Sequence, residues 1–101
     1  MAEWRILAKL SELPEGSAKA VPIGPKTIAV FHHAGQIFAV DDLCPHMGAS
    51  LAAGSVSDGA VACCWHGWRF KLSDGAWVSS PKLRIGSYPV RVVGDEIQAE
   101  C

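Results

Sequence analysis

Cys44-Pro45-His46 and Cys63-Cys64-Trp65-His66 are the two stretches of this 101-residue chain that decide its fold. Each stretch places a cysteine and a histidine close together, and sixteen residues separate His46 from Cys63. Thiolates and imidazoles are both good ligands for transition metals. The pattern therefore predicts one metal centre held by Cys44, His46, Cys63 and His66.

The spacing within each stretch favours two adjacent metal ions over one. Neighbouring ligands of a single tetrahedral zinc usually come from C-x₂₋₄-C or H-x₃₋₅-H spacings, whereas only one residue separates Cys44 from His46. Because both stretches run from Cys to His, both thiolates can hold one iron and both imidazoles the other, with sulfides between them. Two cysteines and two histidines are the ligand set of such a [2Fe-2S] centre.

Longer runs around these ligands resemble a known family. Cys44-Pro45-His46-Met47-Gly48 is similar to the first cluster loop of Rieske-type iron–sulfur proteins, and the run from Cys63 to Phe70 is similar to the second. Ser73-Asp74-Gly75 and the segment 88–92 extend the resemblance, which is greatest to small soluble ferredoxins and nitrite-reductase small subunits. The resemblance implies a Rieske [2Fe-2S] cluster, with His46 and His66 binding iron through Nδ1.

The remaining cysteines leave alternatives open. Cys64 stands where the family usually has Pro, and it could be the ligand in place of Cys63, although the C-x-x-H spacing to His66 favours Cys63. Four cysteines in a short chain can also form two disulfides. The adjacent pair at 63 and 64 is poorly placed for that, and we interpret Cys101 as an incidental exposed thiol.

Composition bounds the partners and the compartment. The formal net charge is −1 and no Lys/Arg cluster stands out, so we expect neither nucleic acid nor an anionic membrane as a partner. No apolar run approaches the roughly 18 residues of a membrane-spanning helix, and the first residues lack the pattern of a signal peptide. We therefore expect a cytoplasmic protein whose partners are other redox proteins.

The rest of the chain predicts an all-β fold with no convincing helix. Expected strands cover 4–8, 18–23, 26–33, 36–41, 69–72, 76–78, 88–93 and 96–99, with turns at Gly24-Pro25, Ala34-Gly35, Asp74-Gly75 and Gly94-Asp95. The segment 11–16 forms at most one helical turn. The strands 18–23, 26–33 and 36–41 read as an antiparallel meander. We expect one domain over 1–101, an antiparallel sandwich or small barrel into which a cluster-binding subdomain is inserted at about 43–68.

Other side chains have expected roles as well. Core contacts are assigned to Ile28, Val30, Ile37, Val40, Val90, Val92 and Ile97. The subdomain is expected to be packed by Trp65, Trp68 and Phe70. Close approach of the backbone to the sulfides is expected at Gly48 and Gly67. The segment that contains Pro81 resembles a family loop that covers the cluster. His32 and His33 are interpreted as surface histidines.

The function we expect is that of a Rieske-type ferredoxin, a one-electron carrier between a flavin reductase and a terminal oxygenase. It would be an electron-transfer component of an oxidoreductase system and no catalyst alone. Neither Ala49 nor Trp65 is the cysteine that high-potential relatives use for an extra disulfide, so we expect the lower part of the Rieske range, below about +100 mV. One alternative is the small subunit of an assimilatory NAD(P)H nitrite reductase, bound to the large subunit. Another is a zinc-stabilised or disulfide-stapled binding module.

Overall fold

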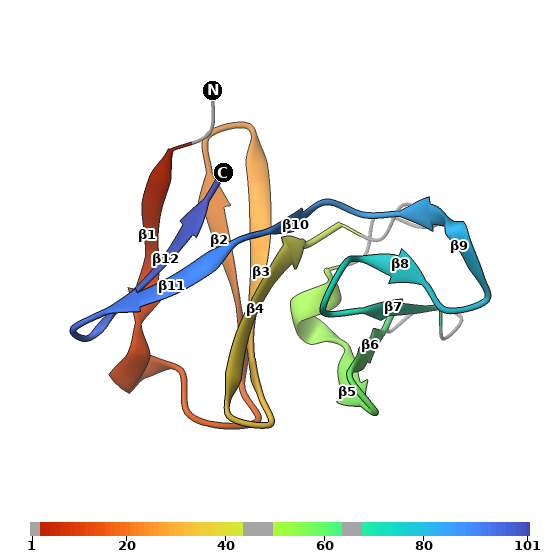
Figure 1. Ribbon diagram of the computed structural model, residues 1–101, viewed down its shortest axis with the longest axis horizontal. Helices are drawn as coiled ribbons and strands as arrows, with labels where there is room; N and C mark the ends of the chain where they lie inside the picture. Colours follow the sequence, from red (N-terminus) through yellow and green to blue (C-terminus); the bar gives the residue numbers. More distant parts are fainter. Residues whose placement is uncertain (1–2, 44–49, 64–67) are drawn as a thin grey trace.

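The computed structural model describes residues 3–43, 50–63 and 68–101, and these residues form antiparallel sheets (Figure 1). The strands are β1 (Trp4–Lys9), β2 (Ala18–Ile23), β3 (Lys26–His33), β4 (Gln36–Asp41), β5 (Ser55–Ser57), β6 (Ala60–Ala62), β7 (Arg69–Lys71), β8 (Ala76–Trp77), β9 (Ser80–Arg84), β10 (Ser87–Tyr88), β11 (Val90–Val93) and β12 (Glu96–Glu100). Two 3₁₀-helices, η1 (Leu10–Glu12) and η2 (Leu51–Ala53), complete the list. The prediction of an all-β fold is confirmed.

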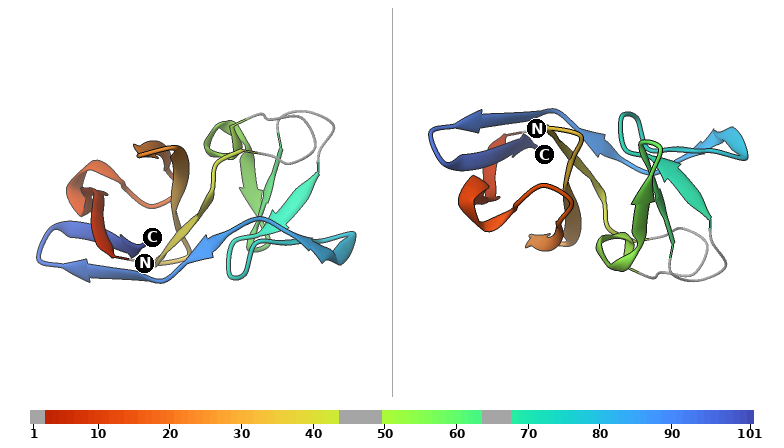
Figure 2. Two further views of the ribbon diagram at one scale, coloured as in Figure 1. Left: turned by 90° about the horizontal axis from the view of Figure 1, so that it is seen from above. Right: turned by 90° about the horizontal axis from the view of Figure 1, so that it is seen from below.

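Two sheets make up the part of the molecule that we call the base. One has the strand order β1-β12-β11 and the other β10-β4-β3-β2. Their shared core consists of buried apolar side chains from both sheets and from the segment after η1, namely Leu7, Leu13, Ile28, Val30, Ala39, Ile97 and Ala99. Figure 2 shows β1 and β12 side by side in the base, and Glu3 and Cys101 exchange backbone hydrogen bonds there.

The second lobe contains η2 and a five-stranded sheet with the order β5-β6-β7-β8-β9. Its core joins side chains of η2, of the sheet and of the adjoining loops to side chains of β3 and β4 from the base, namely Ala29, Phe31, Val40, Leu51, Val61, Cys63, Phe70, Leu72 and Ile85. Because the two lobes share this core, burial of apolar surface fixes the second lobe against the base.

The meander and two other hairpins form where the sequence predicts them. β2, β3 and β4 have the expected bounds and pair in sequence, and the turn at Ala34-Gly35 has positive φ at both residues. That conformation matches the right-handed twist of a hairpin. β7 pairs with β8 across Asp74-Gly75, and β11 pairs with β12 across Gly94-Asp95.

Three features of the base and second lobe differ from the prediction. The strand expected over 88–93 is two strands, because Pro89 separates β10, which pairs with β4, from β11, which pairs with β12. Strands β5, β6 and β9 were not predicted. Val92 was expected in the core but is 44% exposed, because β11 is an edge strand of a three-stranded sheet.

The chain crosses between the lobes at two places, and Asp41 joins them. Asp41 N–H donates to the Gly86 carbonyl (2.8 Å), and Gly86 N–H donates to Asp41 Oδ2 (2.9 Å). The Tyr88 hydroxyl donates to Asp41 Oδ1, and Lys26 Nζ donates to the Tyr88 hydroxyl (3.1 Å). Partial burial raises the pKa of Tyr88, and its hydrogen bond to Asp41 adds to the rise. A Cβ at residue 86 would lie 2.7 Å from Asp41 Oδ2 and 2.9 Å from the Tyr88 hydroxyl oxygen, so a side chain there would displace these hydrogen-bonded groups.

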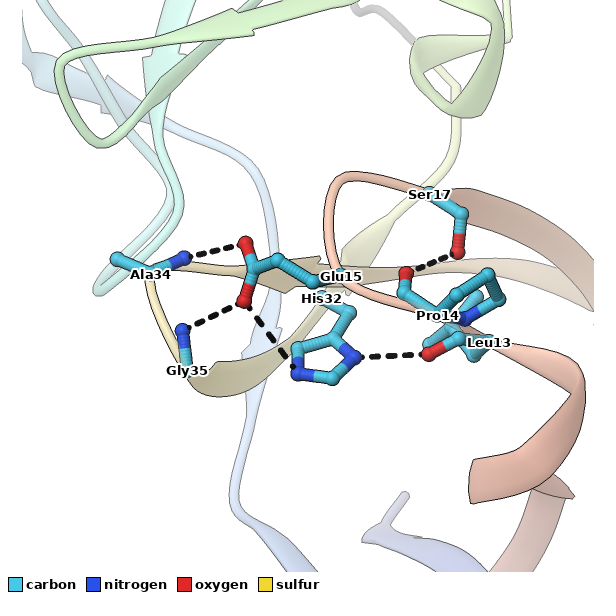
Figure 3. A network of polar contacts seen from close by, with 7 residues as sticks. All are labelled: Leu13, Pro14, Glu15, Ser17, His32, Ala34 and Gly35. Carbon is cyan, nitrogen blue, oxygen red and sulfur yellow. Dashed lines mark hydrogen bonds and ion pairs between the residues drawn. The ribbon is translucent and has the colours of Figure 1, made fainter.

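His32 was expected at the surface, but it holds the lower end of the base together (Figure 3). Only 20% of its side chain is exposed, and its Nδ1 lies 2.7 Å from the Leu13 carbonyl oxygen. Its Nε2 lies 3.5 Å from Glu15 Oε1. The Glu15 carboxylate accepts hydrogen bonds from the backbone N–H groups of Gly35 (2.7 Å) and Ala34 (2.8 Å), and the bond from Gly35 is the largest cause of its lowered pKa.

Candidate metal centre

The predicted ligands divide between described and undescribed residues. Cys44, His46 and His66 lie outside the described residues, as do Cys64, Trp65, Gly48 and Gly67. Cys63 is described and is 3% exposed. Among the described residues there is no group of three or more His, Cys, Asp or Glu side chains that could hold a metal. The described part of the site therefore consists of the residues that flank the segments 44–49 and 64–67.

Asp42 holds together the two ends of the segment 44–49. Its Oδ1 accepts hydrogen bonds from the Ser50 hydroxyl (2.8 Å) and from Ala52 N–H (2.9 Å), and its carbonyl accepts one from Leu51 N–H (2.6 Å). Leu43 and Ser50 pair in an isolated β-bridge. At 3% exposure, Asp42 is the buried charged residue of the described chain, and nothing in the sequence pattern marked it.

A β-hairpin holds the ends of the segment 64–67. β6 and β7 are neighbours in the sheet, with Ala62 opposite Arg69. Beyond the end of this ladder, Cys63 N–H donates to the Trp68 carbonyl (2.6 Å). The position of Cys63 therefore follows from strand pairing.

The flanks of the two segments meet in one core. Leu51, which follows the first segment, and Cys63, which precedes the second, belong to the same cluster of buried side chains as Phe70. Gly54 ends η2 beside β6, where a Cβ would lie only 2.0 Å from the Ala62 carbonyl oxygen. The close approach of η2 to β6 thus depends on the absence of a side chain at Gly54.

Two indole rings stack beside the second segment. The ring centroids of Trp68 and Trp77 lie 4.1 Å apart, with 11° between the ring planes. Both side chains pack against the core that contains Cys63, and Phe70 is fully buried in it, as expected. Trp77 was not singled out in the sequence. Its position two residues after the Asp74-Gly75 turn was the available signal.

Pro81 was expected in a loop, but its backbone lies in β9. The two described cysteines, Cys63 and Cys101, pack against different cores, one in the second lobe and one in the base. A disulfide between these two is therefore excluded. Within the described ranges, no helix is long and apolar enough to cross a membrane.

Comparison with known proteins gives the family. The model of the Rieske [2Fe-2S] domain matches residues 3–89. This chain belongs to the Rieske [2Fe-2S] family. Among curated relatives, the ferredoxin subunit of anthranilate 1,2-dioxygenase from Burkholderia cepacia is 35% identical over 99 residues, covering 97% of this chain and 92% of the relative.

Solved structures of other proteins have the same fold. The ferredoxin of carbazole 1,9a-dioxygenase from Nocardioides aromaticivorans IC177 superposes with a TM-score of 0.86 at 26% identity, and 95% of each chain is covered. A protein of Mycobacterium tuberculosis, assigned as the small subunit of an NADH-dependent nitrite reductase, superposes with a TM-score of 0.90 at 25% identity. That match covers 100% of this chain and 96% of the other.

The residues around the centre fit the Rieske-type [2Fe-2S] cluster of this family. Cys63 offers a thiol that is shielded from water by an apolar core. A Rieske cluster would take thiolates on one iron and imidazoles on the other. The chain supplies one Cys-x-His motif and one Cys-x-x-His motif. When bound, such a cluster accepts and releases one electron.

Proposed function

We propose that this protein is a soluble, cytoplasmic Rieske-type ferredoxin that carries single electrons from a flavin reductase to a terminal oxygenase. The observation that carries the proposal is the similarity to a dioxygenase ferredoxin subunit over nearly the whole length of both chains. In this proposal residues 1–101 are a single domain. Its cluster-binding part, about 43–68, rests on a sheet that continues to Arg84.

We assign Cys44 and Cys63 to one iron and His46 and His66 to the other. The support is geometric as well as chemical, since residues that flank both motifs pack into one core. Leu51 brings the end of the first segment to this core, and Cys63 lies in it at the start of the second. The shared core of these flanking residues supports the assignment of both motifs to one cluster.

Cys63 is our choice over Cys64 as the second thiolate. Its backbone N–H is fixed by the Trp68 carbonyl, and its side chain is buried among apolar groups. Fixing the backbone at the start of the motif restricts where the thiol can lie, which reduces the entropy cost of binding the cluster. Cys64 then needs no role as a ligand.

The test is metal and sulfide analysis of protein purified without oxygen, together with the EPR spectrum of the dithionite-reduced form. We expect two irons and two acid-labile sulfides per chain, and a rhombic signal with the low average g value of mixed nitrogen and sulfur ligation. The matched variants are Cys63→Ala and Cys64→Ala. Cys63→Ala should contain no cluster and Cys64→Ala should keep it, and the opposite result would reassign the thiolate.

A nitrite-reductase small subunit is the second candidate, because the Mycobacterium tuberculosis structure superposes over all of this chain. The two functions differ in what the purified protein can do alone. A carrier should be reduced by a flavin reductase and then reduce a terminal oxygenase as a separate protein. Copurification with a large sirohaem protein from the native host would favour the subunit.

A zinc-stabilised or disulfide-stapled binding module is the third candidate, and it belongs to a different class. The same preparation tests it, because a [2Fe-2S] protein is red-brown and releases sulfide in acid. A colourless protein with one zinc per chain, or with no metal, would support the binding module and rule out electron transfer.

A further inference from the structure

We propose that Asp42 is a positioning residue for the cluster, and that it acts by fixing the two ends of the segment that carries Cys44 and His46. The inference rests on the proposed ligand role of these two residues. Its own evidence is the set of contacts that Asp42 makes, all of which involve described atoms.

Asp42 is buried although it carries a carboxylate. A carboxylate is rarely buried unless hydrogen bonds compensate for the water it loses. Asp42 is 3% exposed, and its Oδ1 accepts bonds from the Ser50 hydroxyl (2.8 Å) and Ala52 N–H (2.9 Å). An apolar side chain at this position would avoid the desolvation cost of the carboxylate. We therefore infer that the carboxylate serves to hold Ser50 and Ala52 in place.

Asp42 also lies where the chain crosses from the base to the second lobe. The segment 44–49 joins β4 of the base to η2 of the second lobe, and these two elements do not pair in a sheet. Strand pairing therefore cannot set the distance between its ends beyond the single bridge of Leu43 with Ser50. Asp42 supplies the missing contacts, since its backbone N–H donates to the Thr27 carbonyl (2.9 Å) in β3 while its side chain holds Ser50 and Ala52.

The chain also offers a matched control for this arrangement. Asp95 accepts hydrogen bonds from the Ser11 hydroxyl (2.8 Å) and from Ser11 N–H (3.0 Å), so it too joins a serine hydroxyl and a backbone N–H. Ser11 lies in η1 and Asp95 lies in the turn between β11 and β12, so this pair belongs to the base. Asp95 therefore makes the same kinds of contact away from the ligand-bearing segments.

The experiment compares Asp42→Ala, Asp42→Asn and Asp95→Ala with the wild-type protein. The rate at which visible absorbance is lost in excess EDTA, below the unfolding temperature, reports cluster retention. Losing two hydrogen bonds of ordinary net strength should make loss from Asp42→Ala about tenfold faster and alter the EPR g values of the reduced form. Asp42→Asn keeps an oxygen acceptor at Oδ1, so it should restore both properties. Asp95→Ala should match the wild type.

A second pair of variants decides the matter if Asp42→Ala does not fold. Ser50→Ala removes only the hydroxyl donor to Asp42, and Ser11→Ala removes the corresponding donor to Asp95. Because Ser50→Ala removes only one of the two hydrogen bonds to Asp42 Oδ1, we expect the cluster to be lost about threefold faster in this variant. The rate of loss should be unchanged in Ser11→Ala.

Two results would overturn the proposed role of Asp42 without affecting the proposed function. One is a normal wild-type cluster with wild-type loss rates and g values in the Asp42 and Ser50 variants. The other is equal acceleration in the Asp42 and Asp95 variants, which would reflect general destabilisation. A wild-type protein without iron and sulfide would overturn the proposed function, and this inference with it.

Discussion

The ends of the two segments that carry the proposed ligands are held in different ways. The segment 44–49 connects elements of different lobes, and a buried carboxylate at Asp42 joins its ends. The segment 64–67 connects neighbouring strands of one sheet, and the β6–β7 ladder places its ends opposite each other. At the first segment, the Asp42 side chain adds to one isolated bridge and one backbone hydrogen bond from Leu51 N–H, whereas a strand ladder holds the ends of the second.

Mutations should therefore affect the two segments differently. A single substitution can remove a side-chain anchor, but no single side chain carries a hydrogen-bonded ladder. We therefore expect the first segment to respond to changes at Asp42 and Ser50, and the second to respond to changes in the packing beneath it. We expect a single substitution to displace both segments only at Gly54 or in the core around Phe70, where the residues that hold the two segments are in contact.

The largest effect is expected for Gly54→Ala. Its φ of −84° suits alanine, but the added Cβ would lie 2.0 Å from the Ala62 carbonyl oxygen, so η2 and β6 must separate. Both segments lose their relative placement, and the purified protein should contain little or no iron. Gly24→Ala is the control, because its surroundings are open although its φ is +59°. A normal iron content in Gly54→Ala would contradict the account of the junction.

Phe70→Ala should have the next largest effect. Phe70 is fully buried in the core shared by the two segments, and such a truncation costs about 3–5 kcal/mol of unfolding free energy. Leu13→Ala is the matched change in the core of the base, with an expected cost of about 2–5 kcal/mol. Denaturant unfolding should show both losses. Only Phe70→Ala should also speed the loss of the cluster, and equal loss in both variants would argue against a separate core beneath the centre.

Trp77→Ala should have a smaller effect that is confined to the second segment. It removes the stacking partner of Trp68, and such an aromatic pair is worth about 0.5–1.5 kcal/mol beyond its buried area. Because the backbone ladder remains, the cluster should bind at full stoichiometry and be lost only a few times faster in EDTA. Trp4→Ala, which removes a ring contact with Arg91 in the base, should leave the loss rate unchanged. Full loss of the cluster in Trp77→Ala would show that stacking, and not the hairpin, positions Cys63.

Glu15→Gln should have the smallest effect, and only on the base. Hydrogen bonds from the N–H groups of Gly35 and Ala34 lower the pKa of Glu15, so its carboxylate stabilises the folded state above the ordinary Glu pKa of about 4.3. This stabilisation is lost as the pH falls through the lowered value. Thermal unfolding should show a small deficit for Glu15→Gln at pH 7 that shrinks below about pH 4. A deficit that is constant with pH would contradict this origin.

The sequence was most informative where local signals agreed. The bounds of β2, β3 and β4 were predicted because β-branched runs alternate with the turns at Gly24-Pro25 and Ala34-Gly35. β5 and β6 were missed because Ser55–Ser57 and Ala60–Ala62 contain mainly small residues, although the Asp58-Gly59 turn between them was a usable signal. Val92 was misplaced because periodicity does not distinguish an edge strand from a central one.

The site was also predicted only where the sequence carried a local signal. The motifs of cysteines and histidines predicted the family and its cofactor, because ligand chemistry is readable from residue type and spacing. The supports of the site were not readable in this way. Asp42 resembles any surface aspartate until its burial is known, and the need for glycine at residue 54 depends on a strand that pairs from elsewhere.

In the proposed centre, two thiolates bind one iron and two imidazoles bind the other. This assignment can be tested by ENDOR spectroscopy of the dithionite-reduced protein labelled with ¹⁵N-histidine. We expect two distinct ¹⁵N couplings of directly bound nitrogens, both unaffected by His32→Ala and His33→Ala. A cluster without bound histidine nitrogen, or couplings that disappear in the His32 or His33 variants, would contradict the assignment of His46 and His66.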